Sequence, residues 1–534
     1  MKQSHYGSGV LVTSQRPLAM AFTLVAALLS LSQPAAAQLT ATDSADIGLT
    51  QLRAENPGLT EGVGVKAHLV EGYVSGGYVP NPDDVQLSGN TIDIVGMPAT
   101  AVLSEILSTH ARTSGRHFYG SSGVARDLGT GGLSIDVYAA TPAQTPDGNT
   151  PTVDWLNFNI FNGNRDPNLS EFDRSTVSSH SYIFTSDPAN QFPDLMRRLD
   201  YIINESDTTT VVGTGNSGSL PASWAPAYNV ITVGRSAGTH GSGLTTTYGS
   251  GRVAIDIVAP EPTTSQATPV VAGAVAILQD AANGSDASTS EVIRATILAG
   301  ATKDAGDITG TWSRTTTQPL DVVFGAGELN ILNSYNIQQA GEFNGGSTTP
   351  VLLSGFSGWD YENSLEVNGQ RLYEFEVTAG SELENLSVVL AWNMNIVDTS
   401  STGFFAPFQF SPVEELANLS LELLDSSGTV VDSSVSDVDN VEHVFQQTLA
   451  AGIYQLRVSN DNGSASDYGL AWRGDLVANL LLGDANLDGV VNFLDIPAFI
   501  SVLSSGAYLE EADCNEDGVL NFLDIPAFIA ILNM

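Results

Sequence analysis

Two twelve-residue loops near the C-terminus carry oxygen-bearing side chains at the same spacing. The second copy follows the first after 29 residues, and each has side-chain oxygens at positions 1, 3, 5, 9 and 12, with glycine at position 6. A hard cation such as Ca²⁺ takes six or more oxygens, and the glycine permits the sharp turn that brings them inward. A backbone carbonyl at position 7 would complete each set. We therefore predict two calcium sites, with the ligands Asp484, Asn486, Asp488, Val490, Asn492 and Asp495 in one loop and Asp513, Asn515, Asp517, Val519, Asn521 and Asp524 in the other.

A second stretch that could carry catalytic chemistry is Thr264–Leu278, in which Ser265 stands just ahead of a predicted helix. Pro269 is placed to open that helix, because proline is favoured in a first helical turn. The positive N-terminal end of the helix would favour negative charge developing beside the Ser265 hydroxyl. Taken alone, the stretch also fits an ordinary helix start.

This stretch resembles the nucleophile motif of the subtilisin-like serine peptidases (subtilases). Residues 211–218, which include Asn216, together with 226–234, are similar to the strand and loop that carry the oxyanion-hole asparagine of that family. The resemblance implies peptide-bond hydrolysis with Ser265 as the nucleophile. Asn216 and the backbone N–H of Ser265 would be the donors to the oxyanion. Residues 64–72 fall where subtilases have a strand ending in the triad aspartate, and there this chain has Glu71.

The general base is the point at which the resemblance weakens. Pro98 stands in the place of the histidine that normally opens the triad helix, which we predict over Thr100–Ala111. His110 lies 12 residues beyond Pro98, or about 18 Å along a helix at about 1.5 Å per residue. His68 would point to the strand face opposite the acid. His180, on a strand that resembles a substrate-lining strand of the family, is the remaining candidate.

Two functions of different class therefore stay open. Losing a triad base can cost on the order of 10⁶ in turnover. One function is a serine endopeptidase with an unrecognised base, and the retained Ser265 and Asn216 favour it. The other is a pseudopeptidase whose cleft binds polypeptide without cutting it, and Pro98 favours that one.

The repeated calcium loops, each followed by one predicted helix, resemble a type I dockerin module over about 50 residues. The resemblance implies that calcium folds the pair of loops, and that the module docks onto a cohesin partner. Dockerins usually carry polar recognition residues near loop positions 10 and 11. Here those positions are apolar, Phe493-Leu494 and Phe522-Leu523, and one interpretation is that they pack the two repeats together.

These motifs lie in separate regions of a 534-residue chain, a length that suggests three or four domains. Alternating strand and helix patterns predict a subtilisin-like α/β domain with a parallel sheet, and short alternating strands predict an antiparallel, jelly-roll-like β-sandwich that is either an appended module or a plain spacer. The predicted regions are a signal peptide (1–37), a lead-in (38–60), the peptidase domain (61–340), the β-sandwich (345–475) and the helical dockerin-like module (476–534).

The net charge of the chain indicates which partners it avoids, and its N-terminal residues indicate where it is located. A net charge of −40 argues against nucleic acid and anionic membranes as partners. The basic start, the apolar run 18–31 and the small residues 35–37 predict export with cleavage before Gln38. No later segment is long enough to span a bilayer, so we expect a secreted or surface-held protein. One cysteine, Cys514, permits no internal disulfide.

Overall fold

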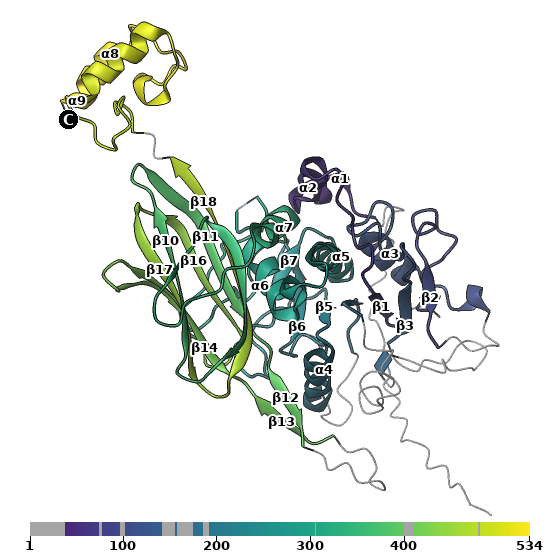
Figure 1. Cartoon of the computed structure of the whole chain (residues 1–534). Helices are drawn as coiled ribbons and strands as arrows, with labels where there is room; N and C mark the ends of the chain where they lie inside the picture. Colours follow the sequence, from purple (N-terminus) through teal and green to yellow (C-terminus); the bar gives the residue numbers. More distant parts are fainter. Residues whose placement is uncertain are drawn as a thin grey trace, which may run out of the picture.

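The computed structural model describes residues 38–73, 77–96, 102–140, 155–156, 175–184, 192–304, 306–399, 410–478 and 481–533. The predicted signal peptide and Pro98 lie outside these ranges. A parallel α/β layer, an antiparallel β-sandwich and a small helical module follow one another along the chain (Figure 1). This order confirms the predicted fold class.

Seven parallel strands form the first sheet, in the order β2-β3-β1-β4-β5-β6-β7. Most of their residues are buried, as expected for a parallel sheet that is covered on both faces. The strands are β1 (Ala67–Glu71), β2 (Ile92–Ile94), β3 (Ile135–Ala139), β4 (Val177–His180), β5 (Thr209–Gly213), β6 (Val230–Arg235) and β7 (Ile257–Ala259).

Helices cover both faces of this sheet. Helices α3 (Thr109–Phe118) and α5 (Thr264–Ala282) pack together on the face that carries Leu69, whereas α4 (Phe192–Ser206) packs on the face that carries Val70. Alternation of side chains along a strand separates these two faces. The other helices of this part are α1 (Ala41–Asp46), α2 (Leu49–Glu55), η1 (Leu103–Glu105), η4 (Asp286–Ser288), α6 (Ser290–Gly300) and α7 (Ile331–Ala340).

The predicted helix over Thr100–Ala111 is wrong. The backbone of Ile106 accepts hydrogen bonds from Tyr78 and Val79, and the N–H of Ser108 donates to the Val79 carbonyl. This pairing interrupts the helix, because only the short 3₁₀ turn η1 forms before it and Leu107 makes a β-bridge with Val79. The Ser108 hydroxyl then accepts from the backbone N–H of Ala111, at 3.3 Å, and caps α3. The helix therefore begins at Thr109.

The β-sandwich consists of two facing sheets, ordered β15-β14-β17-β10-β8 and β16-β11-β18-β9. Neighbouring strands are antiparallel, except for the parallel pair β8 and β10. The strands are β8 (Val351–Leu352), β9 (Ser357–Leu365), β10 (Gln370–Val377), β11 (Ser381–Ala391), β14 (Asn418–Asp425), β15 (Val430–Ser434), β16 (Val441–Leu449), β17 (Gly452–Asn462) and β18 (Ser466–Ala478).

The sandwich shares a core with the α/β layer. Helix α6 packs on β18 and β11 (Figure 1). Helix α7 packs on β9, and the indole of Trp359 donates to the Gln338 carbonyl at 3.0 Å. Trp359, Val389 and Ala471 belong to the same buried cluster as the sheet. A hairpin of β12 (Asn395–Asp398) and β13 (Pro412–Glu415) also reaches α4. The sandwich is therefore not a plain spacer.

The C-terminal module has two α-helices, α8 (Asp495–Ser505) and α9 (Asp524–Leu532), with a short η5 turn (Glu510–Ala512) between them. The rings of Phe499 and Phe528 stack in its core, with centroids 4.0 Å apart. Across the described parts of the chain, no helix combines the length and the apolar character needed to cross a membrane.

Candidate active site

Glu71 ends β1 on the sheet face that α3 and α5 cover. Its side chain is fully buried, and Oε2 lies 2.6 Å from Nδ1 of His110. A buried carboxylate at this distance makes a charge-assisted hydrogen bond to an imidazole. Among the described residues the second oxygen, Oε1, has no hydrogen-bond partner. The extra methylene of glutamate therefore does not keep the acid from reaching a histidine.

His110 occupies the first turn of α3, and its side chain is 12% exposed. Burial opposes protonation of the imidazole, but the Glu71 carboxylate outweighs burial, so the pKa of His110 is raised. Because Nδ1 faces the carboxylate, Nε2 is the nitrogen left to take a proton from a nucleophile.

The expectation that His110 lies far along the triad helix, about 18 Å from its start, is wrong. The reason is the position of the helix start: with α3 beginning at Thr109, His110 lies in its first turn instead of near its end. A local signal for this start was present in the sequence, since Ser108 is a good N-cap residue.

Ser265 lies in the first turn of α5, where the backbone N–H groups have no intrahelical acceptors. Both α3 and α5 follow strands of the parallel sheet, so both begin at its carboxyl edge, where Glu71 ends β1. The predicted start at Pro269 is late, because α5 begins at Thr264. Ser265 is half-buried, and its hydroxyl therefore stays within reach of solvent.

Asn216 follows β5 and is held beside the start of α5. Its Oδ1 accepts from the backbone N–H of Thr264 at 2.8 Å and from the Thr264 hydroxyl at 3.2 Å. This arrangement fixes the amide so that its NH₂ group stays available as a donor, and the side chain is exposed. The predicted oxyanion donor thus lies next to the residue that precedes Ser265.

The other two histidines considered in the sequence lie on the opposite sheet face, with the α4 layer. His180 is fully buried, and its two ring nitrogens are 2.8 Å from the Ser178 hydroxyl and 3.2 Å from the Tyr182 hydroxyl. Burial lowers the pKa of His180 and of His68 to about 3. Both are therefore core residues on the face opposite Glu71.

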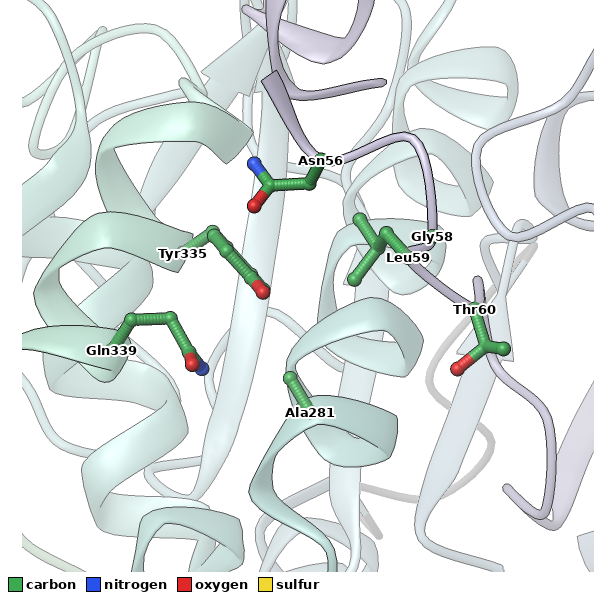
Figure 2. A pocket seen from close by; sticks show the side chains of 7 residues that line it. All are labelled: Asn56, Gly58, Leu59, Thr60, Ala281, Tyr335 and Gln339. Atoms are coloured by element: carbon green, nitrogen blue, oxygen red, sulfur yellow. The ribbon is translucent and has the colours of Figure 1, made fainter. Parts of the chain in front are cut away.

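A polar cleft of about 340 Å³ lies between the end of α2, α5 and α7 (Figure 2). It is bounded by Asn56 after α2, Ala281 in α5, and Tyr335 and Gln339 in α7. Ala281 is 16 residues beyond Ser265 in the same helix, which separates the two by about 24 Å at about 1.5 Å per residue. This cleft therefore lies away from Ser265.

The two C-terminal loops fold as compact turns around their acidic residues. In the first, the Asp484 carboxylate accepts from the N–H groups of Asp488 and Gly489, and Asp495 accepts from those of Asn486 and Asn492. The second loop repeats this pattern around two further aspartates, Asp513 and Asp524. The four aspartates at positions 1 and 12 are at most 4% exposed.

This donor set fits a hard cation. Residues 476–534 contain no Lys, Arg or His, so no side-chain cation offsets the buried carboxylates. Over the described ranges, no group of three or more His, Cys, Asp or Glu side chains is arranged to hold a metal by itself. The amide oxygens of the asparagines and the carbonyls of Val490 and Val519 are therefore needed to complete each site.

The interpretation that the apolar pairs at loop positions 10 and 11 pack the repeats together is wrong. Phe493, Leu494, Phe522 and Leu523 are 72%, 69%, 77% and 68% exposed. The stacked Phe499 and Phe528 join the repeats instead. The four exposed residues, here called the Phe-Leu pairs, face solvent in both repeats.

Comparisons with known proteins give solved structures that overlap much of the chain and a family model that matches its C-terminal end. No curated protein matches the sequence. One matching solved structure is described as the crystal structure of tripeptidyl peptidase 2, with a TM-score of 0.30 and 12% identity over 68% of this chain. The chain spans 40% of that protein. Residues 482–533 match the family model of the dockerin type I domain, which confirms that the C-terminal module is dockerin-like.

Proposed function

We propose that this protein is an exported, subtilisin-like serine endopeptidase with a calcium-binding, dockerin-like tail. The observation that carries the proposal is the 2.6 Å contact between Glu71 and His110, at the sheet edge where the helix bearing Ser265 begins. In this contact Glu71 is the proposed acid and His110 the proposed base for Ser265, the nucleophile that the motif predicts.

In this proposal the Ser265 hydroxyl attacks the scissile carbonyl while Nε2 of His110 takes its proton. Glu71 holds the imidazole through Nδ1 and stabilises the imidazolium that forms. Asn216 and the backbone N–H of Ser265 donate to the oxyanion, a contribution on the order of 10²–10³ in rate. His110 then gives the proton to the leaving amine, and water hydrolyses the acyl-enzyme ester by the reverse sequence.

The pseudopeptidase alternative was favoured by the apparent loss of the base at Pro98. The hydrogen bond between His110 and Glu71 argues against that premise, because it offers His110 as a base. A chain that only bound polypeptide would have no need of a buried carboxylate paired with a histidine, because burying a charge is costly unless it is matched.

For the tail we propose Ca²⁺ in both loops and docking to a cohesin-like protein outside the cytoplasm. The buried, unneutralised aspartates support the metal, since without it they would repel one another. The Phe-Leu pairs support docking, because exposed apolar residues in both repeats offer a surface that a partner can desolvate.

Hydrolysis of casein and labelling by a fluorophosphonate probe, both with millimolar calcium, test the catalytic proposal. The protein starting at Gln38 should cleave and be labelled, and Ser265→Ala should do neither. His110→Ala should lose cleavage by on the order of 10⁴ or more. A wild type that neither cleaves nor reacts with the probe would leave polypeptide binding as the working function.

A further inference from the structure

We propose that Glu328 is the inner ligand of a calcium site in the α/β layer, separate from the two C-terminal loops. The site lies beside α1, and its other side-chain oxygens would come from Ser236 and Thr302 and from the aspartates Asp46 and Asp307. The inference concerns the binding of a metal ion, so it does not depend on the proposed peptidase activity.

Glu328 carries a buried carboxyl group without a partner. The residue is 1% exposed, and among the described residues neither Oε1 nor Oε2 has a hydrogen-bond partner. Protonation alone would not satisfy the group, because the added hydrogen would itself need an acceptor. Buried polar groups in folded proteins are nearly always paired, with the protein, with water or with an ion. The partner of Glu328 is therefore a group that the described part of the chain does not supply.

Two hydroxyls beside Glu328 lack partners in the same way. The backbones of Thr302 and Glu328 exchange two hydrogen bonds, of 2.9 and 2.8 Å, as a directly opposed antiparallel pair. Opposed residues in such a pair project their side chains from the same face, so the Thr302 hydroxyl lies on the side of the carboxyl group. Ser236 follows β6, and its hydroxyl is near enough to act on Glu328. Within the described ranges, both hydroxyl oxygens are buried and unpartnered.

Aspartates add negative charge around this carboxyl group. Burial raises the pKa of Glu328 to about 8, and although Ser236 opposes the rise, nearby aspartates add to it. In order of their effect these are Asp307, Asp46 and Asp43. Every ion pair that a lysine or arginine forms in the described part of the chain is with a carboxylate outside this group of four. A bound cation would offset the charge, whereas a bound water would not.

The donor set contains only oxygen, which selects a hard cation. Ca²⁺ takes six to eight oxygens in a flexible geometry, whereas Mg²⁺ demands a near-ideal octahedron. The carboxylates of the described residues do not converge closely enough to hold a metal by themselves. Hydroxyl and water oxygens would therefore complete the shell, as amide and carbonyl oxygens do in the C-terminal loops. Asp43 is left out of the ligand set because it already accepts from Thr40 at the start of α1.

An ion bound here would join the first helix to the parallel sheet. Glu328 forms a bridge with Val258 of β7, Ser236 follows β6, and Asp46 is the last residue of α1. Separation of α1 from the sheet would break the site. Because the ligands come together only in the folded chain, calcium would bind that state alone and stabilise it.

The test is thermal unfolding of the whole chain from Gln38, followed by tryptophan fluorescence in calcium and in EDTA. All six tryptophans precede residue 476, so this signal reports the α/β layer and the sandwich and not the C-terminal module. Calcium at about 100 times its dissociation constant should raise the Tm of the wild type by about 3–5 °C. Glu328→Gln keeps the size of the side chain but removes its charge, and its shift should be below about 1 °C.

Two further sets of variants complete the test. Asp46→Asn and Asp307→Asn should each raise the calcium concentration of half effect by about tenfold. Asp93→Asn is the matched control, because it removes an exposed carboxylate of β2 outside the group and should keep the wild-type response. Titration calorimetry should find three calcium ions in the wild type and two in Glu328→Gln.

The opposite results overturn the inference. A fluorescence transition that calcium does not move, or that magnesium moves equally at the same ionic strength, would mean that no calcium site exists in this layer. A shift that persists in Glu328→Gln would remove Glu328 from the site. If that variant does not fold, an unchanged calcium response in both aspartate variants refutes the site instead. Loss of casein cleavage in the wild type would refute only the peptidase proposal, because the calcium shift is measured without a substrate.

Discussion

The Glu71→Gln substitution is the sharpest test of the acid–base pair. It keeps the size of the side chain but removes the charge that lies 2.6 Å from His110. Unit charges about 4 Å apart attract by about 4 kcal/mol at an effective dielectric constant of about 20, which corresponds to about 10³ in rate. The glutamine amide can also donate to Nδ1, which puts the imidazole in the wrong tautomer and raises the expected loss in kcat to about 10⁴.

The pH dependence gives the substitution a second, independent readout. The base works only when His110 is deprotonated, and Glu71 raises the pKa of His110 against the effect of burial. Activity of the wild type should therefore fall as the pH drops through a value above the usual 6.5. In Glu71→Gln only burial remains, so the residual activity should persist to lower pH.

The assay is kcat/KM for a short peptide between pH 5 and 9, with Tm measured alongside to show that the variant is folded. Glu71→Asp is the matched control, because it keeps the charge and shortens the reach by one methylene, and its loss should be smaller than that of Glu71→Gln. A Glu71→Gln enzyme within tenfold of wild type, or one whose acid limb does not move, would refute the assignment of Glu71 and His110.

Three further predictions follow from the other parts of the chain. Pro98→His should give no gain in kcat/KM, because His110 already supplies the base; a gain of tenfold or more would mean that the site lacks one. Chelation of calcium, or Asp495→Ala together with Asp524→Ala, should unfold the C-terminal module, seen as lost helical circular dichroism and a lost thermal transition, and an unchanged signal would argue against metal-dependent folding. Trp359→Ala should destabilise the α/β layer and the sandwich together by about 3–5 kcal/mol in one unfolding transition, and two separate transitions would contradict a common core.

The parts of the site that depend on local sequence could be predicted. The calcium loops are set by twelve consecutive residues, and their helices begin where the spacing predicts. Glu71 could be placed because a short apolar strand leads directly to it, and Asn216 because β5 and β6 flank its loop. In each case the information lies within a few residues of the group.

His110 could not be placed, because long-range pairing overrides a local pattern. Val102, Leu103, Ile106 and Leu107 have helical spacing, yet the carbonyl of Ile106 accepts from residues 78 and 79, and only the short 3₁₀ turn η1 forms before Ser108. Val102 is 53% exposed, so the apolar face that this spacing suggests is not all buried. The packing of the sandwich on the α/β layer was equally hidden, since part of it joins distant elements such as α6 and β18.

The shared core also has a consequence for the order in which the protein becomes functional during synthesis. Trp359, Val389 and Ala471 belong to the same buried cluster as the α/β layer, and the sandwich packs on α6 and α7, so these helices cannot complete their packing until the sandwich has been made. Translation proceeds from the N-terminus, and residues 61–340 are therefore complete long before their packing partners. We expect Ser265 and His110 to come together only when the chain is nearly finished. Under the proposed function, this order of assembly would keep the peptidase inactive on the ribosome and protect the cell that makes it.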